Sequence, residues 1–197
     1  MQRPDIGPTL THFTRATAEM SAFNVLLKIL RDRYLIGTSA YTRGGTKCVC
    51  FTEAPLEVVQ DGLRGVDGRE RYSTYGIQIP KSHVFRLGGR PVIYQTESEF
   101  RILPPSLQWR HVRFDLCTDR PVDFTWEREW RVQTERFDFS DQDVIVVVPD
   151  EDAEHRLHEL VEHESFQDAW HWSTVRGDDA WAYHGPSPWK TIKLKKG

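Results

Sequence analysis

The feature that most constrains the fold of this chain is the apolar run Val-Ile-Val-Val-Val at residues 144–148. A run of β-branched residues without alternation is typical of a strand that is buried on both faces. Residues 151–164, which follow directly, are acidic and amphipathic and predict a helix. The chain therefore has to build a hydrophobic core around a sheet.

Shorter segments with strand or helix patterns are scattered along the rest of the chain. Residues 64–73 are interpreted as a charged loop, and residues 97–112 give no assignable pattern. Because strands and helices do not alternate regularly, the sequence predicts a mixed α+β fold rather than a doubly wound sheet. The predicted strands are residues 10–14, 47–52, 75–79, 91–94, 130–134, 143–148 and 190–196. The predicted helices run from about residue 23 to between 34 and 37, and over 55–62, 80–87 and 151–164.

The size and composition of the chain favour one domain that spans residues 1–197. Hydrophobic residues make up 39% and charged residues 28% of the chain, which are ordinary values for a globular protein, and no linker-like stretch divides it. No apolar stretch approaches the roughly 18 to 20 residues of a membrane span, and no apolar signal core follows residues 1–5. We therefore predict a cytoplasmic protein without a membrane partner.

The three cysteines give little support to a metal site. Cys48 and Cys50 lie two residues apart on a predicted strand, which is a poor geometry for a mutual disulfide. No C-x-x-C pair occurs, although Cys117 could join the other two as a third thiolate. The sequence favours buried, small apolar side chains and no metal.

Charge is distributed unevenly along the chain. Residues 1–120 contain 17 Lys and Arg against 12 Asp and Glu, whereas residues 121–197 contain 9 against 17. A basic front half can attract the phosphates of a nucleotide or of nucleic acid; the alternative is an ordinary solvated surface.

Several well-known catalytic motifs are excluded by their spacing. His158 and His163 are five residues apart, whereas the helical zinc-peptidase motif needs two histidines four apart. The glycine pairs form neither a P-loop nor a dinucleotide-binding loop, and no G-x-S-x-G nucleophile elbow occurs.

The segment from Trp126 to Arg131 is the best candidate for chemistry. Glu127 and Glu129 stand two apart just before an apolar strand, so we expect both carboxylates on the same side at the edge of a sheet. Two tryptophans and two arginines surround them, and aromatic surroundings can tune a carboxylate. The alternative is a charged surface strand that serves solubility.

Five segments, taken in order, carry a resemblance to known proteins. They are Leu-Thr-His-Phe-Thr at 10–14, Cys-Phe-Thr-Glu-Ala-Pro at 50–55, Tyr-Gly-Ile-Gln-Ile-Pro-Lys at 75–81, Gly-Arg-Pro-Val-Ile-Tyr at 89–94 and Glu-Arg-Glu-Trp-Arg at 127–131. The chain resembles the AbiGi-type abortive-infection family and is more distantly similar to the ADP-ribosyltransferase fold, including the DNA-modifying toxins of that group. The resemblance covers roughly residues 10–132. It implies an ADP-ribosyltransferase-like core over about residues 10–150, with two small mixed or antiparallel sheets that form a cleft flanked by helices. Residues 151–197 would add a helix and a strand.

That fold binds NAD as a substrate in its cleft, and the resemblance implies which residues meet it here. His12 would contact the adenosine ribose, and Phe51 with Thr52 would line the nicotinamide side. The tyrosine typical of one branch has two candidates, Tyr41 and Tyr75. Arg43, Lys81 or Arg128 would neutralise the pyrophosphate. The residues implied at the cofactor are thus His12, Thr14, Phe51, Thr52, Tyr75 and Arg43.

Four residues of these segments also have a structural explanation. His12 is alternatively a core histidine bonded to backbone, and Thr52 is alternatively a cap for the helix that begins at Pro55. Tyr75 and Tyr94 are alternatively packing residues.

The resemblance also implies the catalytic roles and the setting. Glu129 would be the catalytic carboxylate, and Glu127 would orient the acceptor or take its proton. The expected function is NAD-dependent ADP-ribosyl transfer, a glycosyl transfer, in a toxin–antitoxin or phage-defence setting, with nucleic acid as the favoured acceptor. One alternative is a non-catalytic antitoxin that binds a toxin protein or RNA. Another is an RNA-binding module in which Trp109 and Trp126 stack bases.

Overall fold

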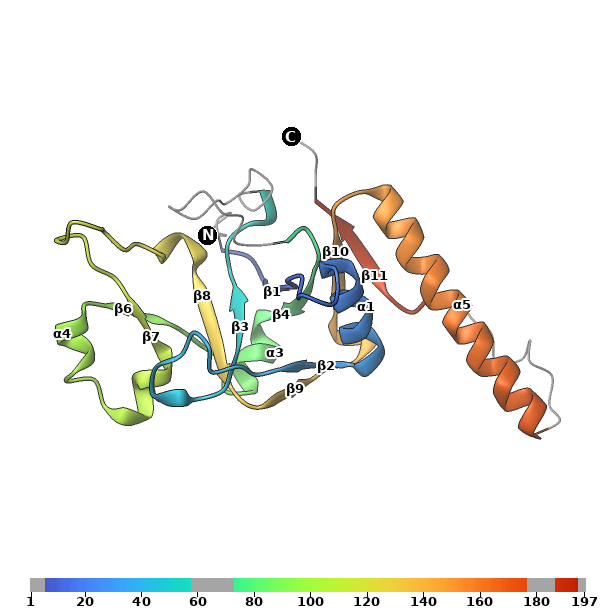
Figure 1. Cartoon of the computed structure of the whole chain (residues 1–197), viewed down its shortest axis with the longest axis horizontal. Coiled ribbons are helices and arrows are strands. Elements are labelled where there is room, and N and C mark those ends of the chain that lie inside the picture. The colour runs from blue at the N-terminus through green and yellow to red at the C-terminus, as the bar shows by residue number, and fades with distance from the viewer. Residues whose placement is uncertain (1–5, 58–72, 177–186, 195–197) are drawn as a thin grey trace.

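The computed structural model describes residues 6–57, 73–176 and 187–194, and it has a mixed α+β architecture (Figure 1). Its main feature is a seven-stranded mixed sheet, in which neighbouring strands are antiparallel except for the parallel pair at one edge. From that edge the strands are β11 (Lys190–Lys193), β10 (Ile145–Val148), β4 (Gly76–Pro80), β1 (Thr9–Phe13), β3 (Cys48–Thr52), β8 (Glu129–Gln133) and β5 (Arg90–Pro91).

The sheet is divided at its middle. β1 pairs with β4 along its whole length, but against β3 its register consists of one pair, Thr11 opposite Thr52. The strands β11, β10, β4 and β1 therefore form one half, called the β1 half, and β3, β8 and β5 form the β3 half. The sequence predicted two small sheets that form a cleft. In the structure, the β1 half and the β3 half are joined through this pair into one large sheet.

Two small sheets and the helices surround the main sheet. One small sheet joins β2 (Tyr34–Ile36) to β9 (Arg136–Asp138), and the other joins β6 (Ile93–Gln95) to β7 (His111–Arg113). The α-helices with assigned bounds are α1 (Ala22–Asp32), α3 (Lys81–Arg86), α4 (Glu97–Phe100) and α5 (Glu151–Arg176). The 3-10 turns are η1 (Arg43–Gly45), η2 (Pro105–Arg110), η3 (Thr125–Glu127) and η4 (Asp141–Asp143).

The hydrophobic core lies between one face of the sheet and α1. Alternate residues of the strands face it, because successive side chains of a strand point to opposite faces. α1 adds Phe23, Leu26 and Leu30 at helical spacing, and the Ser21 side chain caps its first turn by accepting from the backbone of Asn24. The strand residues in this cluster include Leu10, Val49, Phe51, Ile77, Ile79, Trp130, Val132, Val146 and Val148.

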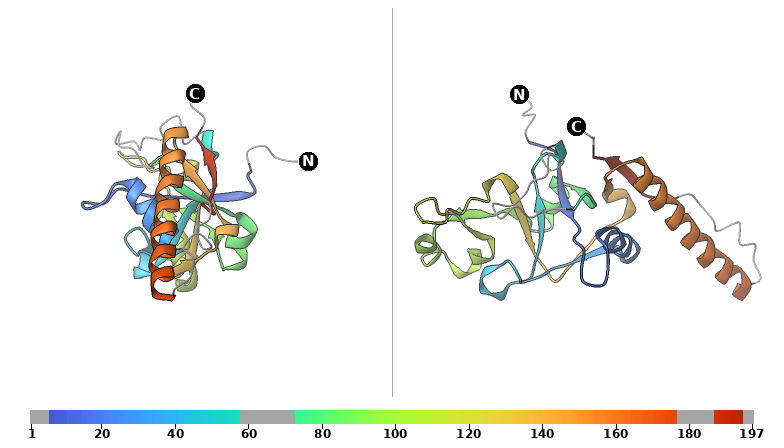
Figure 2. Two further views of the ribbon diagram at one scale, coloured as in Figure 1. Left: turned by 90° about the vertical axis from the view of Figure 1, so that its right-hand side faces the viewer. Right: turned by 45° about the horizontal axis from the view of Figure 1, so that its top comes forward.

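The run that dominates the sequence is buried on both faces, as predicted. Val146 and Val148 belong to the main core, while Val147 faces a second cluster with Phe13 and Leu194. α5 starts directly after this strand and extends away from the body of the molecule (Figures 1 and 2). It continues to Arg176, beyond the predicted end at residue 164.

Other sequence predictions met different outcomes. The helix predicted to end between residues 34 and 37 ends at Asp32, because β2 begins two residues later. The unassigned stretch 97–112 contains α4 and η2 and leads into β7. The predicted helix at 55–62 and loop at 64–73 fall largely outside the described residues. Within the described ranges, every helix is too short or too polar to cross a membrane.

Candidate functional site

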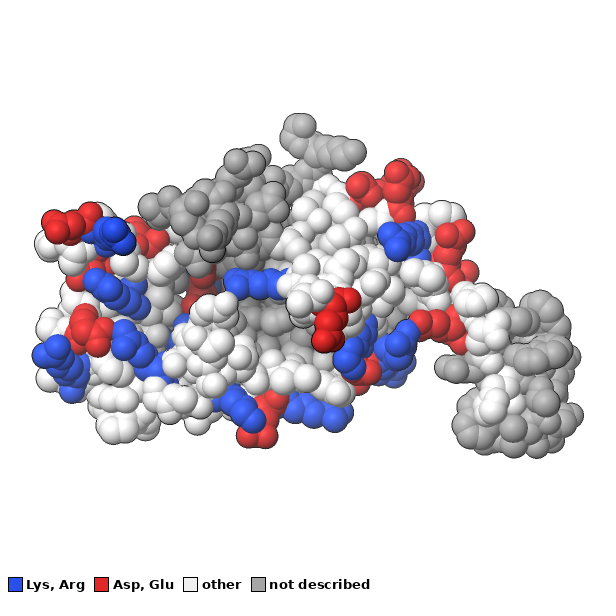
Figure 3. All heavy atoms as spheres, viewed as in Figure 1, with Lys and Arg blue, Asp and Glu red and all other residues white. Residues whose placement is uncertain are grey.

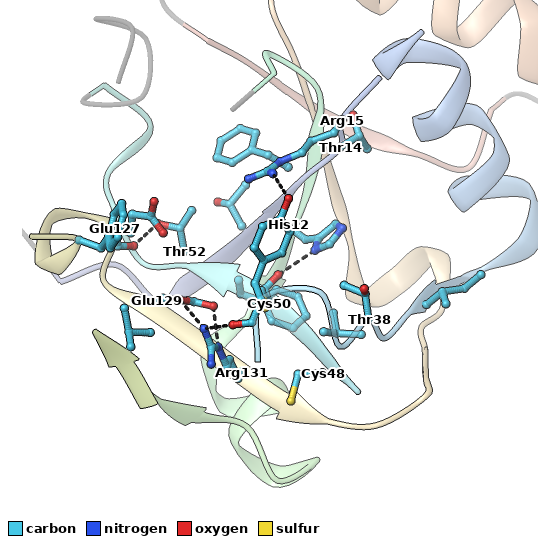
Figure 4. A pocket seen from close by; sticks show the side chains of 18 of the residues that line it. His12, Thr14, Arg15, Thr38, Cys48, Cys50, Thr52, Glu127, Glu129 and Arg131 are labelled. Carbon is cyan, nitrogen blue, oxygen red and sulfur yellow. Dashed lines mark hydrogen bonds and ion pairs between the residues drawn. The ribbon is translucent and has the colours of Figure 1, made fainter. Parts of the chain in front are cut away.

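A cavity of about 670 Å³ opens where β1 and β3 diverge (Figure 4). Its wall comes from β1 with the residues that follow it, from β3, from the start of β8, from the connection between β2 and β3, and from β7. This volume lies in the range of sites that enclose a small organic ligand.

Seven of the eight residues that the sequence placed at catalytic or cofactor positions line this cavity. Tyr75 lies outside its lining and packs against Phe23, with ring centroids 5.3 Å apart. Tyr41, the other candidate tyrosine, lines the cavity. The seven lining residues are His12, Thr14, Arg43, Phe51, Thr52, Glu127 and Glu129.

Glu129 is held in place by Arg131, two residues further along β8 on the same face. The Nε and Nη2 atoms of Arg131 lie 2.8 and 3.2 Å from the two carboxylate oxygens of Glu129. The Arg131 side chain is 3% exposed and that of Glu129 13%. Burial alone would lower the pKa of Arg131, but the neighbouring carboxylate outweighs it and the pKa is raised. Arg131 is therefore charged, and its two hydrogen bonds fix the orientation of the Glu129 carboxylate.

Arg131 also anchors two separate segments of backbone, one at residues 109–111 and one at Tyr41. Its Nη1 donates to the carbonyls of Trp109 (2.8 Å) and His111 (3.1 Å), and its Nη2 lies 3.3 Å from the carbonyl of Tyr41. The sequence drew attention to Arg131 only as a neighbour of the two glutamates. Its alternation with Glu129 on a strand was the available signal for a shared face.

Glu127 reaches the cavity in a different way from the one predicted. It ends η3 and precedes the strand, so strand alternation with Glu129 does not apply. Arg128 between them adopts a left-handed conformation with φ of 44°. The carbonyl of Glu127 accepts a hydrogen bond from the Thr52 hydroxyl, and that of Arg128 accepts from the backbone of Glu53 at 3.1 Å. Both carboxylate-bearing residues are thus pinned to the end of β3.

His12 spans the gap between the two halves of the sheet. Its Nδ1 lies 2.7 Å from the carbonyl of Cys50, and its ring meets Phe51 edge-on at 5.9 Å. Burial lowers the pKa of His12, so the ring is neutral, Nδ1 carries the proton that is donated, and Nε2 is an acceptor. His12 is therefore both a backbone-bonded histidine and a cavity residue.

The two threonines of the site are engaged with backbone. The Thr14 hydroxyl lies 3.0 Å from the carbonyl of Ala22, and the Thr52 hydroxyl donates to Glu127 while accepting from the backbone of Ala54 at 3.0 Å. Both side chains are buried. They position β1, β3 and the glutamate segment rather than offering free donors to a ligand.

Of the three basic residues proposed for the pyrophosphate, two are paired with carboxylates and the third lies at another cavity. Arg43 lines the cavity but pairs with Glu97 at 2.7 Å, and Lys81 pairs with Glu53 outside the cavity lining. Arg128 lies at a separate cavity of about 260 Å³, whose wall also includes Glu129.

Two cysteines of β3 also line the cavity, which the sequence did not indicate. Cys48 is buried, and burial raises its pKa to about 11. Burial raises the pKa of the partly buried Cys50 as well, so both thiols are uncharged. Cys117 is exposed, contrary to the expectation of a buried small residue. Among the described residues, no group of three or more His, Cys, Asp and Glu side chains could hold a metal ion.

Comparison of the chain with protein-family models, with curated proteins and with solved structures gives no match.

Proposed function

We propose that this protein is an NAD-dependent ADP-ribosyltransferase that binds NAD in the 670 Å³ cavity and uses Glu129 as its catalytic carboxylate. The observation that carries the proposal is the register at the divide in the sheet. Thr52 of β3 lies opposite Thr11 of β1 and opposite Glu129 of β8. Thr11 and Glu129 thereby stand on either side of Thr52, and His12, the next residue of β1, is bonded to the carbonyl of Cys50. All four side chains line the same cavity.

The divided sheet supports the finer fold assignment. An ADP-ribosyltransferase-like fold needs two sheets with a cleft between them, and the β1 and β3 halves diverge beside their single registered pair. We therefore propose this fold for the core of residues 10–150, with α5 and β11 added to it.

The proposed chemistry follows from a fixed carboxylate. The bond between the nicotinamide nitrogen and ribose C1′ breaks, its electron pair leaves with neutral nicotinamide, and positive charge develops on the ribose. Glu129 stabilises that charge and binds the ribose 2′-hydroxyl with the lone pairs that Arg131 leaves unused. The acceptor then attacks C1′, and Glu127 takes its proton. The Nε2 atom of His12 accepts a hydrogen bond from the adenosine ribose.

Nucleic acid is the proposed acceptor. Residues 1–120 carry 17 basic against 12 acidic side chains, and three of these arginines, Arg15, Arg43 and Arg113, line the cavity. Basic and acidic side chains are interspersed on the face in Figure 3, and acidic ones gather at the start of α5. The described residues show no continuous basic stripe on that face.

A second candidate is a non-catalytic antitoxin with the same fold. The observation that favours it is the occupation of the site by internal contacts: Arg131 neutralises Glu129, and the hydroxyls of Thr14 and Thr52 bond to backbone. Such a protein would keep the cavity as a structural feature and bind a toxin or RNA through its surface.

The deciding experiment measures NAD binding and nicotinamide release, with and without mixed cellular DNA and RNA. We compare the unmodified protein with Glu129→Gln, Glu127→Gln and the control Glu135→Gln, whose side chain is 80% exposed. We expect Glu129→Gln to abolish release, Glu127→Gln to reduce transfer, and Glu135→Gln to change neither. Circular dichroism verifies that each variant is folded. An absence of NAD binding at millimolar concentration, or release by folded Glu129→Gln at the unmodified rate, would overturn the enzyme and favour the antitoxin.

A further inference from the structure

The arginines of the main cavity differ in their partners. Four arginines line the cavity, and three of them have a carboxylate within ion-pair distance. The three pairs are Arg131 with Glu129 at 2.8 Å, Arg43 with Glu97 at 2.7 Å and Arg113 with Asp115 at 3.6 Å. In the described part of the chain, no carboxylate pairs with the fourth, Arg15.

Arg15 instead meets Tyr41. One guanidinium nitrogen lies 3.4 Å from the Tyr41 hydroxyl, and the guanidinium carbon lies 5.6 Å from the centroid of the ring. Arg15 is exposed and Tyr41 is 69% exposed, although both line the cavity, so their contact lies at its mouth. A contact this long between exposed groups is weak and is easily exchanged for a ligand.

The two residues come from opposite sides of the divide. Arg15 follows β1, and Tyr41 lies in the connection that leads into β3. The backbone carbonyl of Tyr41 is held by Arg131, which also holds Glu129. Figure 4 shows Arg15 across the cavity from Glu129 and Arg131. A ligand that reaches from Glu129 to the mouth therefore ends beside an available guanidinium.

We propose that Arg15 and Tyr41 form an anion-binding pair that takes a phosphate group of a nucleotide at the mouth of the cavity. A guanidinium presents a planar fork of donors that matches two phosphate oxygens, and the Tyr41 hydroxyl adds a third donor. This assigns the role expected of Arg43, Lys81 or Arg128 to a residue that the sequence did not single out. As an assignment of the NAD diphosphate it rests on the proposed function, whereas the binding of a phosphate does not.

The test compares calorimetric titrations of ADP and of adenosine. We expect Arg15→Gln to weaken ADP binding by about tenfold or more, the size of one lost charge-assisted contact, and to leave adenosine binding nearly unchanged. Arg15→Lys keeps the charge without the planar fork of donors, so its ADP affinity should lie between those of the unmodified protein and of Arg15→Gln. Tyr41→Phe should weaken ADP binding less than Arg15→Gln does. Arg43→Gln tests the competing residue, and Arg101→Gln is an exposed control outside the cavity lining.

The outcomes separate this proposal from the proposed function. If Arg15→Gln loses ADP affinity but the unmodified protein releases no nicotinamide, the anion-binding pair is supported and the proposed enzymatic activity is contradicted. If Arg15→Gln releases nicotinamide as efficiently as the unmodified protein and binds ADP equally well, the anion-binding pair is contradicted and the proposed enzymatic activity is supported. An equal loss of ADP and adenosine binding would mean a structural role for Arg15 and would overturn the anion pair.

Discussion

The ion pair between Glu129 and Arg131 determines the local structure around the cavity. Both side chains are nearly buried, and a pair of this kind is stable only when the geometry is good and the remaining donors are satisfied. Arg131 meets that condition through three backbone carbonyls. The pair therefore ties β8 to the segments around Tyr41, Trp109 and His111.

Removing one member of the pair should be costly, and removing both should cost less than the two single losses added together. We expect Arg131→Met to lower the free energy of unfolding by about 3–5 kcal/mol, because it leaves the Glu129 carboxylate buried without a partner. The double variant with Glu129→Gln should lose less than the sum of the two single variants. Urea denaturation measures the cycle. Arg136→Met removes an exposed pair with Asp138 and should cost less than about 1 kcal/mol; equal losses in Arg131→Met and Arg136→Met would contradict the argument.

His12 should make the stability of the fold depend on pH. Burial depresses its pKa below the ordinary 6.5, so the unfolded chain takes up a proton at a pH where the folded chain does not. Stability is then complete above about pH 6.5 and is lost progressively as the pH falls below it. Burial lowers the pKa of His111 in the same direction.

We expect the free energy of unfolding to fall between about pH 7 and pH 5 and His12→Gln to flatten part of that fall. Denaturant titrations across this interval measure it. His155→Gln, at a position whose side chain is 76% exposed, should leave the slope unchanged. A slope that is the same in the unmodified protein and in His12→Gln would refute the role of this histidine.

At the scale of elements, the sequence predicted the segments with strong periodicity and missed the short ones. β1, β3, β4, β8 and β10 were all predicted, because each has an apolar pattern that its own residues display. β2 and β9 have three residues each and form only by pairing across about 100 positions, from Tyr34 opposite Asp138 to Ile36 opposite Arg136. A local pattern carries no information about such a partner.

The same limit applies to the site. Glu129 and His12 were found because residue type and order pointed to them. The single registered pair between Thr11 and Thr52 was not, because register arises when two distant strands meet. Arg15 was not singled out for a related reason. Among the described residues it has no carboxylate partner, and only the three-dimensional structure can show this.

The close approach of β4 to β1 gives a prediction for the element that carries His12. A Cβ atom on Gly76 would lie 2.5 Å from the carbonyl oxygen of His12 and 3.1 Å from Phe13, so the strands would have to separate. We expect Gly76→Ala to lower the free energy of unfolding by roughly 2 kcal/mol or more and to weaken ligand binding in the cavity. Gly7→Ala, where the nearest atom is 3.8 Å away, is the matched control. Thermal denaturation of both variants decides, and equal melting temperatures would contradict the close approach.

At the scale of the whole molecule, the described residues 187–194 complete the core. β11 extends the sheet beside β10. Leu194 packs with Val147 and Phe13 in the second hydrophobic cluster, which Val147 faces. Trp189, just before β11, is 6% exposed and lies against Phe139, with ring centroids 6.4 Å apart. β11 is therefore joined to β10, the strand that contains the apolar run of residues 145–148.

Trp189 provides a test of whether β11 and the rest of the core unfold together. Its truncation to alanine should lower the free energy of unfolding by about 3–5 kcal/mol, because a large buried side chain leaves a cavity beside Phe139 and loses its contact with the Arg33 guanidinium at 6.0 Å. Ile192→Ala, at a β11 position that is 38% exposed, should cost much less. If the C-terminal strand belongs to one cooperative unit, both variants unfold in a single urea transition that coincides for fluorescence and circular dichroism. A second transition, or an unchanged midpoint in Trp189→Ala, would mean that residues 189–194 dock on a core that is stable without them.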